Sequence, residues 1–149
     1  KDYTPDYVFI QFGHNDCPGK GPERQTDPAT TYKDYLRGYV NDCRAMGAVP
    51  IIVSPMTRRN FADGKIKTIL GPYSDAAREL AADMDVPFVN LHARSVAMFN
   101  ELGDAGSAYL SSGPADRTHF SREGALAMCE LVRDELRTKY PDIAASLFK

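Results

Sequence analysis

The chain has 149 residues, a length typical of a single domain that buries roughly two-thirds of its unfolded surface. Hydrophobic residues make up 43% and charged residues 26%, as in ordinary globular domains. The formal net charge of -2 provides no basic footprint, and no apolar run reaches the ~20 residues needed to span a membrane. Nucleic acid and membrane are therefore not expected partners.

Apolar and amphipathic segments alternate along the chain. In order, the pattern predicts a strand at 7–12, a helix at 31–46, a strand at 48–54, a helix at 72–84, a strand at 86–91, and helices at 95–102 and 122–140. Polar loops are expected at 56–71 and 103–118. This alternation predicts an α/β fold, with right-handed βαβ units, a parallel sheet and helices on both of its faces.

Two of the predicted helices show an apolar stripe. In the helix at 31–46 the stripe comprises Tyr32, Tyr35, Leu36, Tyr39, Val40 and Cys43, and in the helix at 122–140 it comprises Ala125, Leu126, Cys129, Val132 and Leu136. Three cysteines, Cys17, Cys43 and Cys129, are scattered and odd in number, and no Cys-x-x-Cys pair suggests a metal or redox site. We expect all three to be small buried thiols.

Polar residues follow the first two predicted strands. Gly13-His14-Asn15-Asp16 comes after the first strand, and Ser54, Arg58 and Arg59 follow the second. In parallel α/β sheets, ligands bind beyond the carboxyl ends of the strands. We therefore expect chemistry at this edge of the sheet.

A second polar cluster, Asp116-Arg117-Thr118-His119, precedes the last predicted helix. A carboxylate three residues before a histidine can accept a hydrogen bond from one imidazole nitrogen, which leaves the other to act as a general base. Taken alone, the pattern is more often a helix cap beside a surface histidine. Its combination with Gly13–Asp16 favours the catalytic interpretation.

Each residue of the first cluster has its own expected role. The Asn15 carboxamide could donate a hydrogen bond to an oxyanion, and Gly13 lets the backbone turn and a substrate approach. An Asx-turn that caps the loop is the alternative for Asn15. It is the favoured interpretation for Asp16, because a carboxylate would repel an oxyanion.

These motifs, Gln11-Phe12-Gly13-His14-Asn15-Asp16 and Asp116-x-x-His119, resemble those of the SGNH (GDSL-like) hydrolases, in particular the rhamnogalacturonan acetylesterase branch. The resemblance implies a three-layer α/β/α flavodoxin-like fold and hydrolysis of acetyl esters on a pectic polysaccharide. It implies Asn15 as oxyanion-hole donor, His119 as base and Asp116 as its orienter. It further implies a secreted or periplasmic protein, with no metal or organic cofactor.

Substrate contacts are expected at Gly13 and His14 and at Arg58 and Arg59. Guanidinium groups pair well with the carboxylate of a uronic acid, although solvated loop charges would give the same sequence. The expected partner is thus an acetylated polysaccharide or oligosaccharide.

The family's Gly-Asp-Ser nucleophile motif and its second oxyanion glycine are not found in this sequence. We therefore expect residues 1–149 to be the C-terminal part of one catalytic domain whose first strands are missing. The strand at 7–12 would then have an open edge through which the chain could self-associate. Ser54 is the alternative nucleophile, but Pro55 follows it and the chain continues as a loop, which does not suit a nucleophile elbow.

Three other interpretations remain open at the level of sequence. The same fold could act on another acyl compound, such as a lipid or thioester. His14, Asp16, Asp116 and His119 could bind a metal, although no tight ligand spacing supports this. The chain could also be a non-catalytic remnant that lacks its nucleophile.

Overall fold

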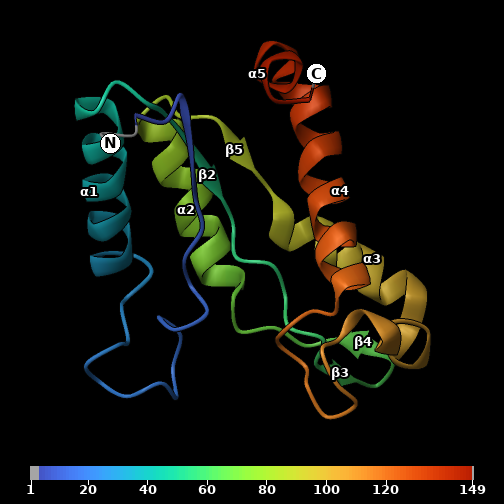
Figure 1. Ribbon diagram of the computed structural model, residues 1–149. Helices are drawn as coiled ribbons and strands as arrows, with labels where there is room; N and C mark the ends of the chain where they lie inside the picture. The colour runs from blue at the N-terminus through green and yellow to red at the C-terminus, as the bar shows by residue number, and fades with distance from the viewer. Residues whose placement is uncertain (1–3, 149) are drawn as a thin grey trace. The chain divides into compact units, whose positions relative to one another are not determined.

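The computed structural model describes residues 4–148, and its chain divides into two compact units (Figure 1). The first unit extends to Pro55 and resumes from Ile69 to Asn90. The second combines Met56–Thr68 with the chain from Leu91 onward.

A parallel sheet lies in the first unit. It contains β1 (Tyr7–Ile10), β2 (Val49–Val53) and β5 (Phe88–Val89) in the order β1-β2-β5. β1 and β2 pair in parallel from Tyr7 opposite Val49 to Ile10 opposite Ile52, and β5 pairs in parallel with the end of β2. The three predicted strands are confirmed, although each is shorter than its apolar run.

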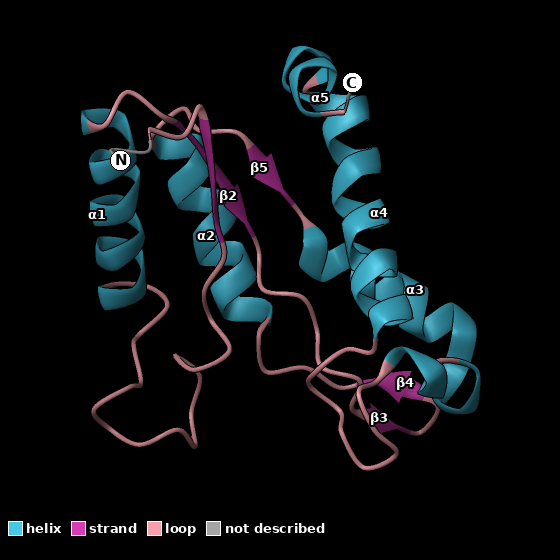
Figure 2. Cartoon of the chain, viewed as in Figure 1, coloured by secondary structure: helices cyan, strands magenta, loops and turns pink. Residues whose placement is uncertain are grey.

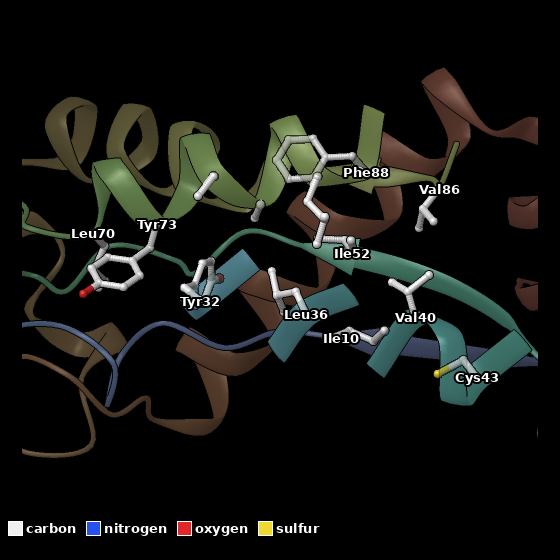
Figure 3. Packing of buried hydrophobic residues seen from close by; sticks show 14 of the residues in the cluster. Ile10, Tyr32, Leu36, Val40, Cys43, Ile52, Leu70, Tyr73, Val86 and Phe88 are labelled. Carbon is white, nitrogen blue, oxygen red and sulfur yellow. The ribbon is translucent and has the colours of Figure 1, made fainter. Parts of the chain in front are cut away.

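Helices α1 (Thr31–Ala45) and α2 (Gly71–Asp83) pack against these strands and against each other. Figure 3 shows side chains of both helices meeting those of the strands in one apolar core. The core includes Ile10, Leu36, Val40, Ile52, Leu80 and Phe88. Burial of these side chains supplies the main stabilisation of the unit.

The apolar stripe of α1 is narrower than the sequence predicts. Tyr32, Leu36, Val40 and Cys43 are buried, as predicted. Tyr35 is 62% exposed and Tyr39 is 41% exposed, so their predicted burial is wrong. Both lie on the flank of the stripe, where the Tyr39 ring stacks on Phe12 at a centroid distance of 4.9 Å.

The second unit contains a short hairpin in the segment predicted as a polar loop (Figure 2). β3 (Phe61–Ala62) pairs with β4 (Lys65–Ile66) in antiparallel fashion. The two turn residues, Asp63 and Gly64, have φ angles of 51° and 73°. This turn requires positive φ angles, which Asp and Gly adopt more readily than most residues, so an Asp-Gly pair is a strong hairpin signal. The hairpin could therefore have been predicted from the sequence.

Four helical segments complete the second unit: α3 (Leu91–Gly106), the 3₁₀ turn η1 (Ala108–Leu110), α4 (Arg122–Lys139) and α5 (Pro141–Leu147). α3 is longer at both ends than predicted and is interrupted by Gly103, which has a φ of 71°. The helix predicted at 122–140 is confirmed, and α5 was not predicted. None of the helices within residues 4–148 is long and apolar enough to cross a membrane.

The buried face of α4 differs from the predicted one. Leu136 is buried, as predicted, and Gly124 and Met128 are buried with it, whereas Leu126 is 50% exposed and Cys129 is exposed. A Cβ at Gly124 would lie 2.1 Å from the Leu110 carbonyl oxygen, so glycine is what allows this face to approach the backbone of η1. The expectation of three buried thiols is therefore correct for Cys17 and Cys43 and wrong for Cys129.

The edge of β1 generates a prediction about association. Within the described residues β1 pairs with β2 alone, and Phe9 on β1 is 43% exposed. We expect the 149-residue chain to self-associate, because an unprotected edge strand offers free backbone donors and acceptors. Phe9→Lys should shift the population toward monomer in sedimentation velocity, since a charge on an edge strand opposes pairing.

Met46→Lys is the matched control, since Met46 is 53% exposed and lies outside the sheet at the end of α1. It should leave the association unchanged. A wild-type chain that stays monomeric at every concentration contradicts the prediction.

Candidate active site

The loop before α4 holds Asp116 and His119 in one hydrogen-bonded turn. Asp116 Oδ1 accepts hydrogen bonds from the backbone N–H groups of Thr118, at 2.7 Å, and His119, at 2.8 Å. Its Oδ2 lies 2.8 Å from His119 Nδ1. The structure thus brings together the two residues that the sequence predicted as a pair.

Ser112 supports the same pair from the preceding segment. Its hydroxyl donates to Asp116 Oδ2 at 2.8 Å, and its backbone N–H donates to the His119 carbonyl oxygen at 3.1 Å. A β-bridge between Ser111 and Phe120 lies next to these contacts. Sequence analysis missed Ser112, because a serine in a loop rich in Gly, Ser and Pro carries no distinguishing signal.

These hydrogen bonds define the charge state of the pair. The backbone N–H groups of His119 and Thr118, together with the side chains of His119 and Ser112, hold the pKa of Asp116 well below its usual range. Asp116 is therefore ionised at neutral pH and can only accept, so the proton of a neutral His119 ring lies on Nδ1. Nε2 then carries a lone pair, and the His119 side chain is 77% exposed. This geometry suits a general base.

In the first unit, the turn after β1 is closed by Asp16. Its Oδ2 accepts from the Gly13 N–H at 3.0 Å, and its Oδ1 accepts from the Thr26 hydroxyl at 3.3 Å. Asp16 caps this loop as predicted, but its bond runs back to Gly13 and is not the forward bond of an Asx-turn. Asn15 lies within the closed turn and is exposed to solvent.

The hydroxyl groups of two core tyrosines bond to the backbone of this turn. The Tyr32 hydroxyl donates to the Phe12 carbonyl oxygen at 3.1 Å, and the Tyr73 hydroxyl lies 2.8 Å from the carbonyl oxygens of Asp16 and Thr26. Burial raises the pKa of both tyrosines, so both remain protonated donors. Sequence analysis gave neither a role in the site. The only signal was a tyrosine, with its hydroxyl, on an otherwise apolar helix face.

Ser54, the alternative nucleophile, lies inside the first unit. It is fully buried, and its hydroxyl lies 3.5 Å from the Val89 carbonyl oxygen and 3.4 Å from Asn90 Oδ1. A serine in this position is not presented to a substrate. The structure therefore argues against Ser54 as the nucleophile.

The residues predicted to contact substrate fall into different environments. His14 and Arg58 are half-buried, and their contact with a substrate stays a prediction. The Arg59 side chain is only 5% exposed, and its guanidinium makes an ion pair with Asp104. A substrate contact is not compatible with this burial, so we no longer expect one at Arg59.

The metal-binding interpretation gains no support from the structure. Within residues 4–148, no cluster of three or more His, Cys, Asp or Glu side chains has the geometry to hold a metal ion. Asp16 and Asp116 instead accept the hydrogen bonds from protein donors described above.

A polar cavity lies beside the Gly13–Asp16 turn in the first unit. It has a volume of about 320 Å³, and its lining includes Asp16, Glu23, Gln25, Thr26, Tyr35 and Tyr39. Exposed tyrosines combined with amide, hydroxyl and carboxylate groups offer both a flat apolar surface and hydrogen-bonding partners. Such a lining suits a polar ligand with apolar faces.

Comparison with known proteins gives a family match over most of the chain. The model of the GDSL-like Lipase/Acylhydrolase family matches residues 1–127. The match includes the Gly13–Asp16 turn, Asp116 and His119.

Two curated proteins of Bacillus subtilis (strain 168) are similar in sequence. The probable rhamnogalacturonan acetylesterase YesY is 34% identical over 148 residues, covering 97% of this chain and 68% of YesY. The rhamnogalacturonan acetylesterase RhgT is 34% identical over 142 residues, covering 87% of this chain and 60% of RhgT. The chain thus spans only about two-thirds of the length of these relatives.

Solved structures show the same fold. The YXIM protein of Bacillus subtilis matches with a TM-score of 0.76 and 25% identity, over 89% of this chain and 37% of that one. A catalytic mutant of Axe2, an acetylxylan esterase from Geobacillus stearothermophilus, matches with a TM-score of 0.63 and 22% identity, over 89% and 58%. The α/β/α fold class predicted from the sequence is confirmed.

The geometry of Gly13 generates a prediction about stability. Gly13 has a φ of +129°, and an added Cβ would lie 2.9 Å from Pro55 Cγ. Gly13→Ala should therefore lower the free energy of unfolding by about 1–3 kcal/mol, the usual cost of such backbone strain, and more if Pro55 cannot move. Chemical denaturation monitored by circular dichroism measures this change.

Gly19→Ala is the matched control in the same loop region. Gly19 also has a positive φ of +91°, but an added Cβ would meet no atom within 4 Å. Gly19→Ala should lower the free energy of unfolding by less than Gly13→Ala does. Equal decreases in the free energy of unfolding would show that the contact with Pro55 is not the reason for glycine at position 13.

Proposed function

The chain belongs to the GDSL-like lipase/acylhydrolase family, and on this premise we propose that it forms part of an esterase that removes acetyl groups from carbohydrate. The observation that carries the proposal is the Asp116–His119 pair. An ionised carboxylate is bonded to Nδ1, and the Nε2 of an exposed imidazole is left to accept a proton. The similarity to rhamnogalacturonan acetylesterases supports the reaction class.

In the proposed mechanism, His119 Nε2 removes the proton from a serine hydroxyl as its oxygen attacks the acetyl carbonyl carbon. The negative charge that develops on the carbonyl oxygen accepts a hydrogen bond from the Asn15 carboxamide. Asp116 stabilises the imidazolium, which then returns the proton to the departing sugar oxygen. Water, deprotonated by the same histidine, releases acetate from the acetyl-serine in the second half of the reaction.

We further propose that the nucleophilic serine belongs to a segment outside these 149 residues. The burial of Ser54 supports this, because the one strand-end serine that the sequence suggested is not accessible. The greater length of the similar acetylesterases supports it as well.

We propose an acetylated pectic glycan as the substrate. The names of the two similar proteins support this class, and so does the cavity beside the Gly13–Asp16 turn. Sugars combine hydroxyl groups with apolar ring faces, which match the polar groups and the exposed tyrosines of its lining. Arg58 is the remaining candidate to bind the carboxylate of a uronic acid.

Substitution of the catalytic residues tests the proposal in the full-length protein that contains this chain. His119→Ala should abolish hydrolysis of p-nitrophenyl acetate and of acetylated pectin. Asn15→Ala should lower kcat by about 10²–10³-fold, the usual loss for one oxyanion donor. Both side chains are exposed, so the two variants should fold.

His92→Ala and Asn41→Ala are the matched controls, because these residues lie on α3 and α1 and have no assigned role in catalysis. Their kcat values should equal that of the wild type. Full activity in both His119→Ala and Asn15→Ala would refute the assigned roles.

The cavity lining leads to a prediction about substrate size. Tyr35 lines the cavity and is 62% exposed, so Tyr35→Ala should remove a stacking surface without disturbing the core. One aromatic contact is worth about 0.5–1.5 kcal/mol, so KM for an acetylated oligosaccharide should rise about 3- to 10-fold. KM for p-nitrophenyl acetate, which is too small to reach a second subsite, should not change.

Tyr35→Phe retains the ring and should behave almost as the wild type. Equal KM changes for the large and the small substrate would argue against a glycan subsite in this cavity.

A further inference from the structure

We propose that Arg59 is a positioning residue for the Asp116–His119 pair, and that it acts through Ser111, Asp104 and the backbone of Arg117. This inference rests on the proposed function, because it assigns Arg59 to the support of that catalytic pair. It replaces the substrate contact that the sequence suggested for Arg59. All of the residues involved lie in the second unit.

The Arg59 guanidinium bonds to several groups inside the protein through its Nε and Nη1 atoms. Its Nε donates to the Ser111 hydroxyl at 2.9 Å. Its Nη1 lies 2.5 Å from the Asp104 carbonyl oxygen, 2.6 Å from Asp104 Oδ1 and 3.2 Å from the Ser107 hydroxyl. A buried guanidinium is costly unless its donors are satisfied, so this set of partners fixes its position.

The contact with Ser111 connects Arg59 to the catalytic pair through the next residue of the chain, Ser112. Ser111 precedes Ser112, whose hydroxyl donates to Asp116 Oδ2, the same oxygen that faces His119 Nδ1. The Ser112 N–H also donates to the His119 carbonyl oxygen. A displacement of Ser111 would therefore move two hydrogen bonds that orient the base and its carboxylate.

A second connection passes through Arg117, which lies between the two members of the pair. The backbone N–H of Arg59 donates to the Arg117 carbonyl oxygen at 2.8 Å. The Asp104 carboxylate forms ion pairs with both guanidinium groups, that of Arg59 and that of Arg117. The segment at 56–68 thus holds the loop on both sides of Asp116.

Arginine is required at this position because its donors point in fixed directions. The Nε and Nη1 groups reach Ser111 and Asp104 at the same time. A lysine ammonium is a single point charge on a flexible chain and cannot reproduce that fork. Catalytic geometry is sensitive to small errors, since a displacement of about 1 Å can cost about 10²-fold in rate.

The test uses Arg59→Lys in the full-length protein. We expect kcat for p-nitrophenyl acetate to fall by about 10- to 10²-fold while KM changes by less than about 2-fold. The NMR signal of the His119 Nδ1 proton should broaden, because its partner is no longer held in place. Ser111→Ala removes one acceptor and should lower kcat about 3- to 10-fold, again without a change in KM.

Arg133→Lys is the matched control, because Arg133 lies on α4 and pairs with the adjacent Asp134 at the surface. It should retain the wild-type kcat and the His119 signal. A lower melting temperature with an unchanged kcat in Arg59→Lys would overturn the inference, since Arg59 would then be merely structural. If Arg59→Lys does not fold, a wild-type kcat in Ser111→Ala overturns it equally.

His119→Ala separates this inference from the proposed function. If His119→Ala retains activity, the proposed function is wrong. If His119→Ala is inactive while Arg59→Lys and Ser111→Ala keep the wild-type kcat, only the positioning role of Arg59 is wrong.

Discussion

The turn that carries His119 in the second unit depends on the Asp116 carboxylate, whose acceptor positions are all occupied. Asp116 receives two backbone N–H groups on one oxygen, and a serine hydroxyl and the imidazole on the other. The same contacts shape the turn and lower the pKa of the carboxyl. One set of hydrogen bonds therefore decides both where the histidine lies and which of its nitrogens carries the proton. Structure and protonation state are two consequences of a single arrangement.

The first unit uses a similar device for a different purpose. The Asp16 carboxylate closes its turn by accepting the Gly13 N–H and the Thr26 hydroxyl, which leaves Asn15 at the exposed tip. The aspartate in this cluster is a structural acceptor, whereas its neighbour Asn15 has the amide donor that an oxyanion requires. The difference follows from charge, because a carboxylate beside an oxyanion would oppose the reaction. In both turns, an aspartate accepts backbone N–H groups and fixes the loop that carries the side chain proposed to take part in the reaction.

The parts that sequence could predict are those set by local pattern. The strands and helices of the first unit follow from apolar periodicity, and the Asp116–His119 contact follows from a spacing that one turn can close. The burial of Arg59 could not be predicted, because it depends on acceptors supplied by Asp104 and Ser111, far away in the sequence. The exposure of Leu126 and Cys129 on α4 could not be predicted either, because it also depends on a residue distant in the sequence. Gly124 and its close approach to Leu110 select the buried face, and the apolar residues alone do not reveal this.

The adjacent residues Arg58 and Arg59 show why side-chain type alone does not assign a function. Their chemistry is identical, and either guanidinium could bind the carboxylate of a uronic acid. Arg59 meets a carboxylate, two serine hydroxyls and a backbone carbonyl inside the protein. Since the Arg59 side chain is buried and those partners occupy its Nε and Nη1 groups, it is placed to hold the loop rather than to bind a ligand. We infer that the buried arginine supports the site from within, whereas Arg58 is the member of this pair that we propose to contact a uronic acid.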